Sequence, residues 1–311
     1  MDLFLALVLM TLTSLWAMIT GRRLGQFASN RSRLVAQIVV VTASTLYLSF
    51  IWNQSLVTLI LPHAALIVLA NWLPMIASFF TGMYWSATEI SRTRRLFLGS
   101  LTLLLASYSI VAPIVGQAPR CAPAAPDSLL ISQSTPYTCS PAVAASLLRL
   151  HGIAASEAEM ARLCLTRKGT HWMGLYRGLK LMTQETSWDV MALPFSRDAI
   201  MNLDGSPALL SINIDPDLIE NAKDHGFHGS RGHSVLVLSS RNDRELMVFD
   251  PAPSYGIECW NREILSWVSN GVILYLEPRN GSEQDGTVRT RINRATENID
   301  HFAYISWRTP L

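Results

Sequence analysis

A long stretch without charged side chains constrains this 311-residue chain more than any other feature. From Leu34 to Thr88 there is no Lys, Arg, Asp or Glu. A run of about 20 apolar residues is long enough to cross the hydrocarbon core of a bilayer as a helix. A soluble protein would need a very large polar shell to cover such a stretch. The sequence therefore predicts membrane-spanning helices here.

Turn residues and charges divide residues 1–116 into four expected membrane helices. Asn53-Gln54-Ser55 forms a turn inside the uncharged stretch, and Pro62 and Pro74 predict kinks in the helix that follows it. The first apolar run does not have the pattern of a signal peptide, because its positive residues, Arg22 and Arg23, follow it. The expected spans are residues 3–20, 34–52, 56–80 and 96–115.

The composition changes after the fourth span. Residues 117–126 are rich in proline and alanine, which predicts a stiff and extended linker. Residues 127–279 have an ordinary globular composition, and residues 280–311 are polar without an assignable pattern. We therefore expect a transmembrane domain, a linker, one globular domain and an unassigned C-terminal extension.

Several function classes are disfavoured by the composition. A net charge of +2 gives no support to nucleic-acid binding, and no GxxxxGK[ST] phosphate loop is present. The four cysteines show neither CxxC nor zinc-type spacing, so we expect no structural metal site. The cysteines are Cys121, Cys139, Cys164 and Cys259. We expect Cys164 and Cys259 to be core thiols or an oxidised pair, and Cys121 lies in the linker.

One cysteine stands at the start of an apolar, alanine-rich segment. Pro141 suits a first helical turn, and Gly152 suits the end of the same helix. A thiol at a helix N-terminus is favoured as the nucleophilic thiolate. Gln133, six residues before Cys139, offers an amide donor. A thiolate, a side-chain amide and the backbone N–H of Cys139 together form a nucleophile with an oxyanion hole.

The pattern after this helix predicts helices first and antiparallel strands later, which is an α+β order. Ser156 and Glu159 form a capping box that opens the next helix. Further helices are expected at residues 173–183, 197–202 and 262–269, and strands at 188–193, 208–214, 233–239, 245–250 and 271–276.

A histidine and an aspartate come together at one end of an expected hairpin. His233 begins one apolar strand and Asp250 ends the next, so their side chains can meet. Such a pair supplies the base and the orienting group that a thiol nucleophile needs. The preceding polar stretch, residues 215–232, contains His225 and His228. We expect it to be a solvated loop that caps the site or selects substrate, not a metal site.

These residues resemble the double-glycine leader peptidases, papain-like cysteine peptidases that are often fused to bacteriocin ABC exporters. Gln133, five residues and Cys139 resemble the start of that family's active site. Three further blocks follow in the family's order over about residues 127–278. They are Gly169-Thr170 with Gly174-Leu175, Gly232-His233, and Asp250-Pro251. The chain departs from the family at Ser140-Pro141, because a glycine usually follows the cysteine.

The resemblance implies a papain-like fold and a cysteine peptidase. By it, Cys139 attacks the scissile carbonyl, His233 takes and returns the proton, and Asp250 fixes the imidazole tautomer. Gln133 and the Cys139 N–H bind the oxyanion, and no metal or organic cofactor is needed. The implied substrate is an exported peptide or protein precursor cut after Gly-Gly. One alternative is a non-cleaving module that binds a leader or export substrate, which Ser140-Pro141 keeps open. Another is a different amide or acyl-transfer chemistry on the same fold.

Basic residues predict which side of the membrane each loop faces. Short loops rich in Lys and Arg stay in the cytoplasm. Two expected loops, residues 21–33 and 81–95, carry most of the arginines of the membrane domain, and the turn at Asn53-Gln54 carries none. We therefore expect an inner-membrane protein whose peptidase domain lies on the extracytoplasmic side. The expected partners are the lipid bilayer and a peptide substrate, with an export-system partner left open.

Overall fold

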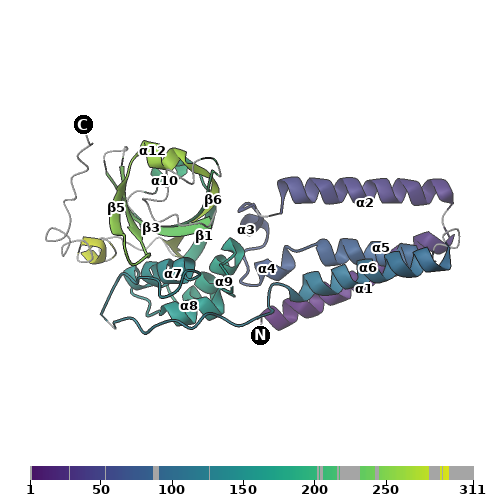
Figure 1. Ribbon diagram of the computed structural model, residues 1–311, viewed down its shortest axis with the longest axis horizontal. Helices are drawn as coiled ribbons and strands as arrows, with labels where there is room; N and C mark the ends of the chain where they lie inside the picture. Colours follow the sequence, from purple (N-terminus) through teal and green to yellow (C-terminus); the bar gives the residue numbers. More distant parts are fainter. Residues whose placement is uncertain are drawn as a thin grey trace. The chain divides into compact units, whose positions relative to one another are not determined.

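The computed structural model forms two compact units, residues 1–116 and 117–311, and each is described by itself (Figure 1). The residues that it describes are 2–27, 29–52, 54–86, 91–125, 127–201, 203, 206–215, 217, 232–241, 245–279, 288 and 290–293.

The first unit is helical throughout its regular parts. Its elements are α1 (Asp2–Phe27), α2 (Asn30–Phe50), α3 (Val57–Ile60), α4 (Leu66–Leu69), α5 (Leu73–Ser86) and α6 (Arg92–Val111). Four segments are long and apolar enough to cross a membrane, namely Leu3–Gln26, Arg31–Phe50, Leu66–Ser86 and Arg92–Val111. Most of the large apolar side chains of α1, α2 and α6 are exposed, as expected of surfaces that lipid would cover.

Glycines allow α1 and α5 to approach each other closely. A Cβ added to Gly21 would lie 2.0 Å from the Phe79 carbonyl oxygen, and one added to Gly25 would lie 2.8 Å from that of Met83. Small residues at such positions let membrane helices pack backbone against backbone. Because later residues of α1 meet later residues of α5, the two helices run in the same direction.

The third expected span, residues 56–80, was wrong in its position and continuity. The structure replaces its first half by α3 and α4 and continues the membrane-length segment to Ser86. Pro62 explains the break after α3, because proline disfavours a helical residue before it and lacks the N–H that continues a helix. Pro74 is instead accommodated in the first turn of α5.

Among its described residues, the second unit has three larger helices, a six-stranded sheet and several short helical segments. The larger helices are α7 (Cys139–Leu150), α8 (Glu157–Leu163) and α9 (Trp172–Thr183). The strands are β1 (Trp188–Pro194), β2 (Ala208–Ile214), β3 (Gly232–Arg241), β4 (Glu245–Asp250), β5 (Gly256–Trp260) and β6 (Val268–Pro278). The short helices are α10 (Arg197–Met201) and α12 (Arg262–Ser266). The expected α+β order is confirmed, although β5 was missed and the helix expected at 262–269 ends at Ser266.

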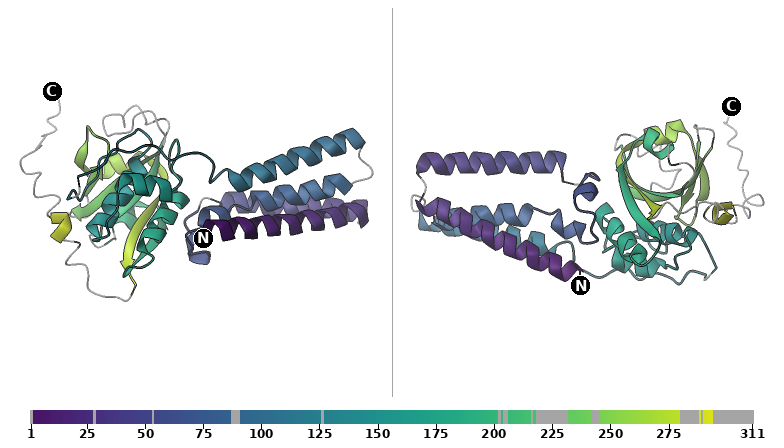
Figure 2. Two further views of the ribbon diagram at one scale, coloured as in Figure 1. Left: turned by 90° about the horizontal axis from the view of Figure 1, so that it is seen from below. Right: turned by 180° about the vertical axis from the view of Figure 1, so that it is seen from behind.

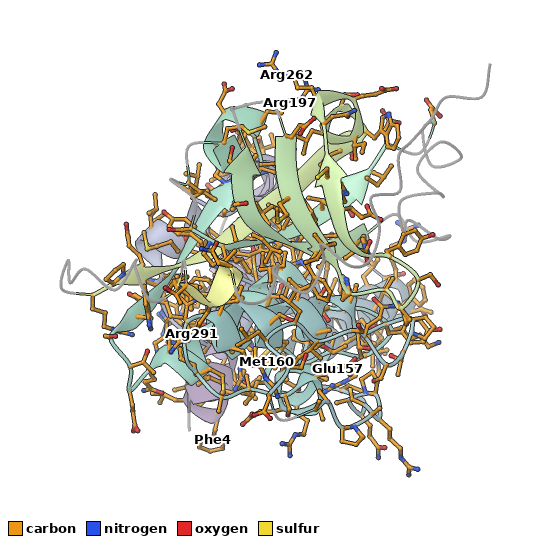
Figure 3. The ribbon with its side chains drawn as sticks, turned by 90° about the vertical axis from the view of Figure 1, so that its left-hand side faces the viewer. Phe4, Glu157, Met160, Arg197, Arg262 and Arg291 are labelled. Atoms are coloured by element: carbon orange, nitrogen blue, oxygen red, sulfur yellow. The ribbon has the colours of Figure 1, made fainter. Side chains whose placement is uncertain are left out.

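The sheet is antiparallel and strongly curled, with the order β1-β6-β2-β3-β4-β5 (Figures 1 and 2). Helix α7 packs against β2 and β3, while α10 and α12 lie at the opposite side of the sheet. The core between the sheet and these two short helices includes Ile212, Val235, Val248, Trp260 and Leu265. Figure 3 shows Arg197 and Arg262 at that side, far from Glu157 and Met160 of the helical layer, which consists of α7, α8 and α9.

Part of the C-terminal extension packs onto the helical layer. Residues 290–293 are helical, and Val288 and Ile292 are buried. Arg291 (labelled in Figure 3) donates from Nη1 to the Leu150 carbonyl oxygen at 3.2 Å. A cationic side chain at this position satisfies one of the carbonyl groups left unpaired at the end of α7. The stretch left unassigned on sequence grounds therefore contributes to the domain.

Candidate active site

Cys139 is the first residue of α7, as the sequence predicted. Thr135 and Thr138 form the turn that precedes it, with their hydroxyl groups 3.0 Å apart and the Thr138 hydroxyl bonded to the Thr135 carbonyl at 3.0 Å. Gly152 follows the end of the helix at φ +80°, a conformation that favours glycine. The thiol is half-buried at the N-terminal end of a helix that is otherwise almost wholly buried.

His233 and Asp250 meet at the predicted end of the hairpin of β3 and β4. Leu236 pairs with Phe249 in the register of the two strands, which brings the start of β3 beside the end of β4. His233 Nε2 lies 2.8 Å from Asp250 Oδ2. Asp250 is fully buried, and its Oδ1 accepts a hydrogen bond from the Ala252 N–H at 2.8 Å. Both carboxylate oxygens are therefore held, and the imidazole is oriented by one of them.

The thiol and the imidazole favour each other's charged forms. Burial alone would raise the pKa of the Cys139 thiol, but a hydrogen bond from His233, its charge and the Ser234 N–H together hold this pKa below its usual range. Burial likewise opposes the charged form of His233, whereas Asp250 and Cys139 raise the pKa of the imidazole to about 10. The arrangement is that of a thiolate–imidazolium pair backed by a carboxylate.

Ser140 and Ser234 were not predicted to belong to the site. Ser140 Oγ lies 2.8 Å from Ser234 Oγ and 3.9 Å from the sulfur of Cys139. Both serines are buried. The pair joins the residue after the cysteine to the residue after His233, and thus ties the start of α7 to β3. The one sequence signal for this pair is that each serine directly follows a predicted site residue, Cys139 or His233.

Gln133 is held beside the same end of the hairpin. Its backbone N–H donates to the Pro251 carbonyl at 2.7 Å, directly after Asp250. Its side-chain Oε1 is buried, and among the described residues it has no hydrogen-bond partner. The structure therefore brings the backbone of Gln133 to the His–Asp end of the sheet. The amide oxygen is thus an unused acceptor among the described residues.

Other sequence candidates do not join this cluster. All four cysteines are free; Cys164 is buried, which raises its pKa to about 12, and Cys259 is exposed, so the two are not an oxidised pair. Gly174, which belongs to the motifs of the family resemblance, packs against the Cys164 carbonyl. Within the described ranges no group of three or more His, Cys, Asp or Glu side chains could hold a metal ion. His225 and His228 lie outside the described residues.

Comparisons with known proteins give one sequence relative and distant structural neighbours. No protein family model matches the chain. An uncharacterised protein of Methanothermobacter marburgensis is 32% identical over 152 residues, which cover 49% of this chain and 89% of that protein. The peptidase domain of Streptococcus ComA, a bi-functional ABC transporter involved in a quorum sensing pathway, matches with a TM-score of 0.38 and 22% identity, over 48% of this chain and 97% of that domain. The peptidase domain of Streptococcus mutans ComA matches with a TM-score of 0.32 and 20% identity, over 48% and 98% of the two chains.

The chain thus combines four helices of membrane-spanning length with an α+β domain that carries a cysteine, a histidine and an aspartate at one end of an antiparallel sheet. The Methanothermobacter match covers most of that relative at more than 30% identity. The chain belongs to the same protein family as that uncharacterised protein.

Proposed function

We propose that the protein is a membrane-anchored cysteine peptidase. The observation that carries the proposal is the hydrogen-bonded series of Cys139, His233 and Asp250, in which the pKa of the thiol is lowered and that of the imidazole is raised. A preformed thiolate next to an imidazolium is the reactive state of thiol peptidases. The ordered motifs that resemble double-glycine leader peptidases support the same assignment.

In this proposal the Cys139 thiolate attacks the carbonyl carbon of the scissile peptide bond. The imidazolium of His233 gives its proton to the leaving amine, and the resulting thioester is then hydrolysed by a water molecule that loses its proton to the imidazole. The Cys139 N–H and the Gln133 amide would stabilise the negative oxygen of both tetrahedral intermediates. Asp250 keeps Nε2 of His233 protonated, so that Nδ1 serves the thiol and the leaving group.

The substrate side of the proposal is a peptide or protein precursor cut after Gly-Gly. It is supported by the motif resemblance, and it is tested with the full-length protein in detergent micelles. A peptidyl-Gly-Gly-coumarin amide should release its fluorophore, and a peptidyl-Ala-Ala-coumarin amide should react more slowly. Cys139→Ala and His233→Ala should abolish release, and Glu159→Gln serves as a folded control. Full activity in Cys139→Ala would refute the peptidase assignment, and binding without release in the wild type would favour the non-cleaving alternative.

We further propose that the peptidase domain faces away from the cytoplasm. Arg22 and Arg23 lie near the end of α1, and Arg92, Arg94 and Arg95 lie at the start of α6, directly after α5. Because α1 and α5 run in the same direction, these arginines lie at the same end of the helical unit. The positive-inside rule assigns that end to the cytoplasm. The end of α6, which leads to the linker, then lies on the other side.

A further inference from the structure

A buried carboxylate grips the residue next to Gln133. Glu157, the first residue of α8, is 2% exposed, and its Oε1 and Oε2 accept from the Ser134 N–H at 2.8 Å and the Ser134 hydroxyl at 2.7 Å. Burying an ionised carboxylate is costly unless hydrogen bonds compensate it. Both compensating donors that the structure records come from Ser134. The carboxylate is thus committed to one short segment of the chain.

That segment is fixed from both sides. Gln133 donates its backbone N–H to the Pro251 carbonyl at 2.7 Å, and Ser134 is held by Glu157. The Ser134 hydroxyl also accepts from the Ala122 N–H at 3.1 Å. Two neighbouring residues are therefore anchored to the end of β4 and to the start of α8. The backbone from which the Gln133 side chain projects is therefore held in place on both sides.

We propose that Glu157 is a positioning residue for the oxyanion donor Gln133. The inference rests on the proposed function, because that function gives Gln133 its role as an oxyanion donor. It assigns to Glu157 no role in forming the thiolate. Among the described residues, the side-chain hydrogen bonds of Glu157 go to Ser134, so its role is assigned to the oxyanion hole and not to the thiolate. Transition-state hydrogen bonds are sensitive to displacements of about 1 Å, and one oxyanion donor is worth about 10²–10³-fold in rate.

Two reagents separate the thiolate from the oxyanion hole. Iodoacetamide alkylates the Cys139 sulfur by displacing iodide, and no oxyanion forms. With p-nitrophenyl acetate the sulfur–carbon bond forms, the ester carbon–oxygen bond breaks and p-nitrophenolate leaves, after an oxyanion intermediate. Both rates are measured on the full-length protein in detergent micelles, by mass spectrometry of the Cys139 peptide and by the absorbance of p-nitrophenolate.

Glu157→Gln should slow acylation by roughly 10-fold, less than the loss of the donor itself, and leave alkylation within about two-fold of wild type. The variant removes the charge that strengthens both bonds, and its NH₂ group takes away the acceptor of the Ser134 hydroxyl, so the segment loosens without losing volume. In a Gln133→Ala background the same substitution should cause no further loss of acylation, because the group it positions is gone. Glu159→Gln, which removes the same charge from the same helix, should leave both rates unchanged.

Several outcomes would overturn the inference. Acylation equal to wild type in Glu157→Gln, equal slowing of acylation and alkylation, or a full additional loss in the double variant would each do so. If Glu157→Gln does not fold, Ser134→Ala removes only the hydroxyl partner and should slow acylation alone. If Gln133→Ala itself acylates normally while Cys139→Ala does not, the oxyanion assignment within the proposed function fails. A Gln133 effect without a Glu157 effect overturns the positioning role alone.

Discussion

Replacing Asp250 by asparagine is the sharpest test of the site. The variant keeps the shape of the side chain, and its Oδ1 can still accept from the Ala252 N–H, which now lies 2.8 Å away. It places an NH₂ group where Oδ2 accepts from His233 Nε2 at 2.8 Å. Two donors cannot face each other, so the imidazole must leave Nε2 unprotonated. The imidazolium form, which needs both nitrogens protonated, becomes unfavourable.

The size of the effect follows from the contacts. The pKa of His233 rises from 6.5 to about 10 in the folded site. At about 1.4 kcal/mol for each pKa unit, this is roughly 5 kcal/mol in favour of the imidazolium, supplied by Asp250 and Cys139 together. A hydrogen bond to a charged group is worth about 1.5–3 kcal/mol. Losing the Asp250 share should therefore lower the pKa of His233, and raise that of Cys139, by about one to two units.

The rate of Cys139 alkylation depends on pH through the ionisation of the thiol in both proteins. The thiolate of Cys139 is present above its depressed pKa, so alkylation of the wild type should rise with pH through a midpoint below about 8.5. In Asp250→Asn this midpoint should move upward, so that alkylation between the two midpoints slows about 10- to 100-fold. Peptide hydrolysis also needs the imidazolium, so in the wild type it should decline as pH rises through about 10.

The assay is alkylation by iodoacetamide from pH 4 to pH 10, followed at each cysteine by mass spectrometry of the full-length protein in detergent micelles. Cys259 is exposed and serves as an internal control, whose profile should be the same in both proteins. An unchanged Cys139 midpoint in Asp250→Asn would refute the argument that the carboxylate sustains the thiolate through His233. A wild-type midpoint at or above about 8.5 would refute the ion pair itself.

The remaining predictions concern the serine pair, the packing of α9 and the sidedness of the domain. Ser140→Ala removes a neutral hydrogen-bond partner near the sulfur of Cys139, so the pH midpoint for alkylation of Cys139 should rise by roughly half to one pH unit. A lowered midpoint would contradict a stabilising contact between the Ser140 hydroxyl and the thiolate. Gly174→Ala would put a Cβ 2.3 Å from the Cys164 carbonyl oxygen, so it should lower the free energy of unfolding of the domain by about 1–3 kcal/mol, measured by thermal melts. An unchanged melting temperature would show that α8 and α9 can move apart to make room for the methyl group. Alkaline phosphatase fused after Pro126 should be active and a cytoplasmic reporter fused there should be silent, whereas the reverse result would place the domain in the cytoplasm.

Much of the second unit could be predicted because its signals are local. Pro141 in the first turn marks the start of α7 and Gly152 beyond the last turn marks its end, and each signal acts within one turn of the helix. The Ser156 side chain caps α8 by accepting from the Glu159 N–H, as the capping box predicted. The His–Asp meeting followed from two strands joined by a short connection, because such strands must run antiparallel.

Elements with weak local patterns could not be predicted. Strand β5 (Gly256–Trp260) buries only its last residue fully, so it lacks the alternation by which a half-buried strand is recognised. The prolines predict a kink and not the break found between α3 and α5, because membrane helices tolerate proline. The choice between kink and break depends on neighbouring helices. Strand β6 lies between β1 and β2, a placement that no local signal encodes.

By itself, the sequence determined where α7 and α8 begin, which residue is the nucleophile candidate, and which runs are apolar enough to cross a membrane. Only the tertiary structure decided which polar groups support the site. Ser140 meets Ser234 across 94 positions of the chain, and Glu157 reaches back 23 positions to Ser134. Helix caps and strand periodicity are set by neighbours a few residues apart. The partner of a buried hydroxyl or carboxylate is set instead by how whole elements pack, because any nearby donor or acceptor can satisfy it.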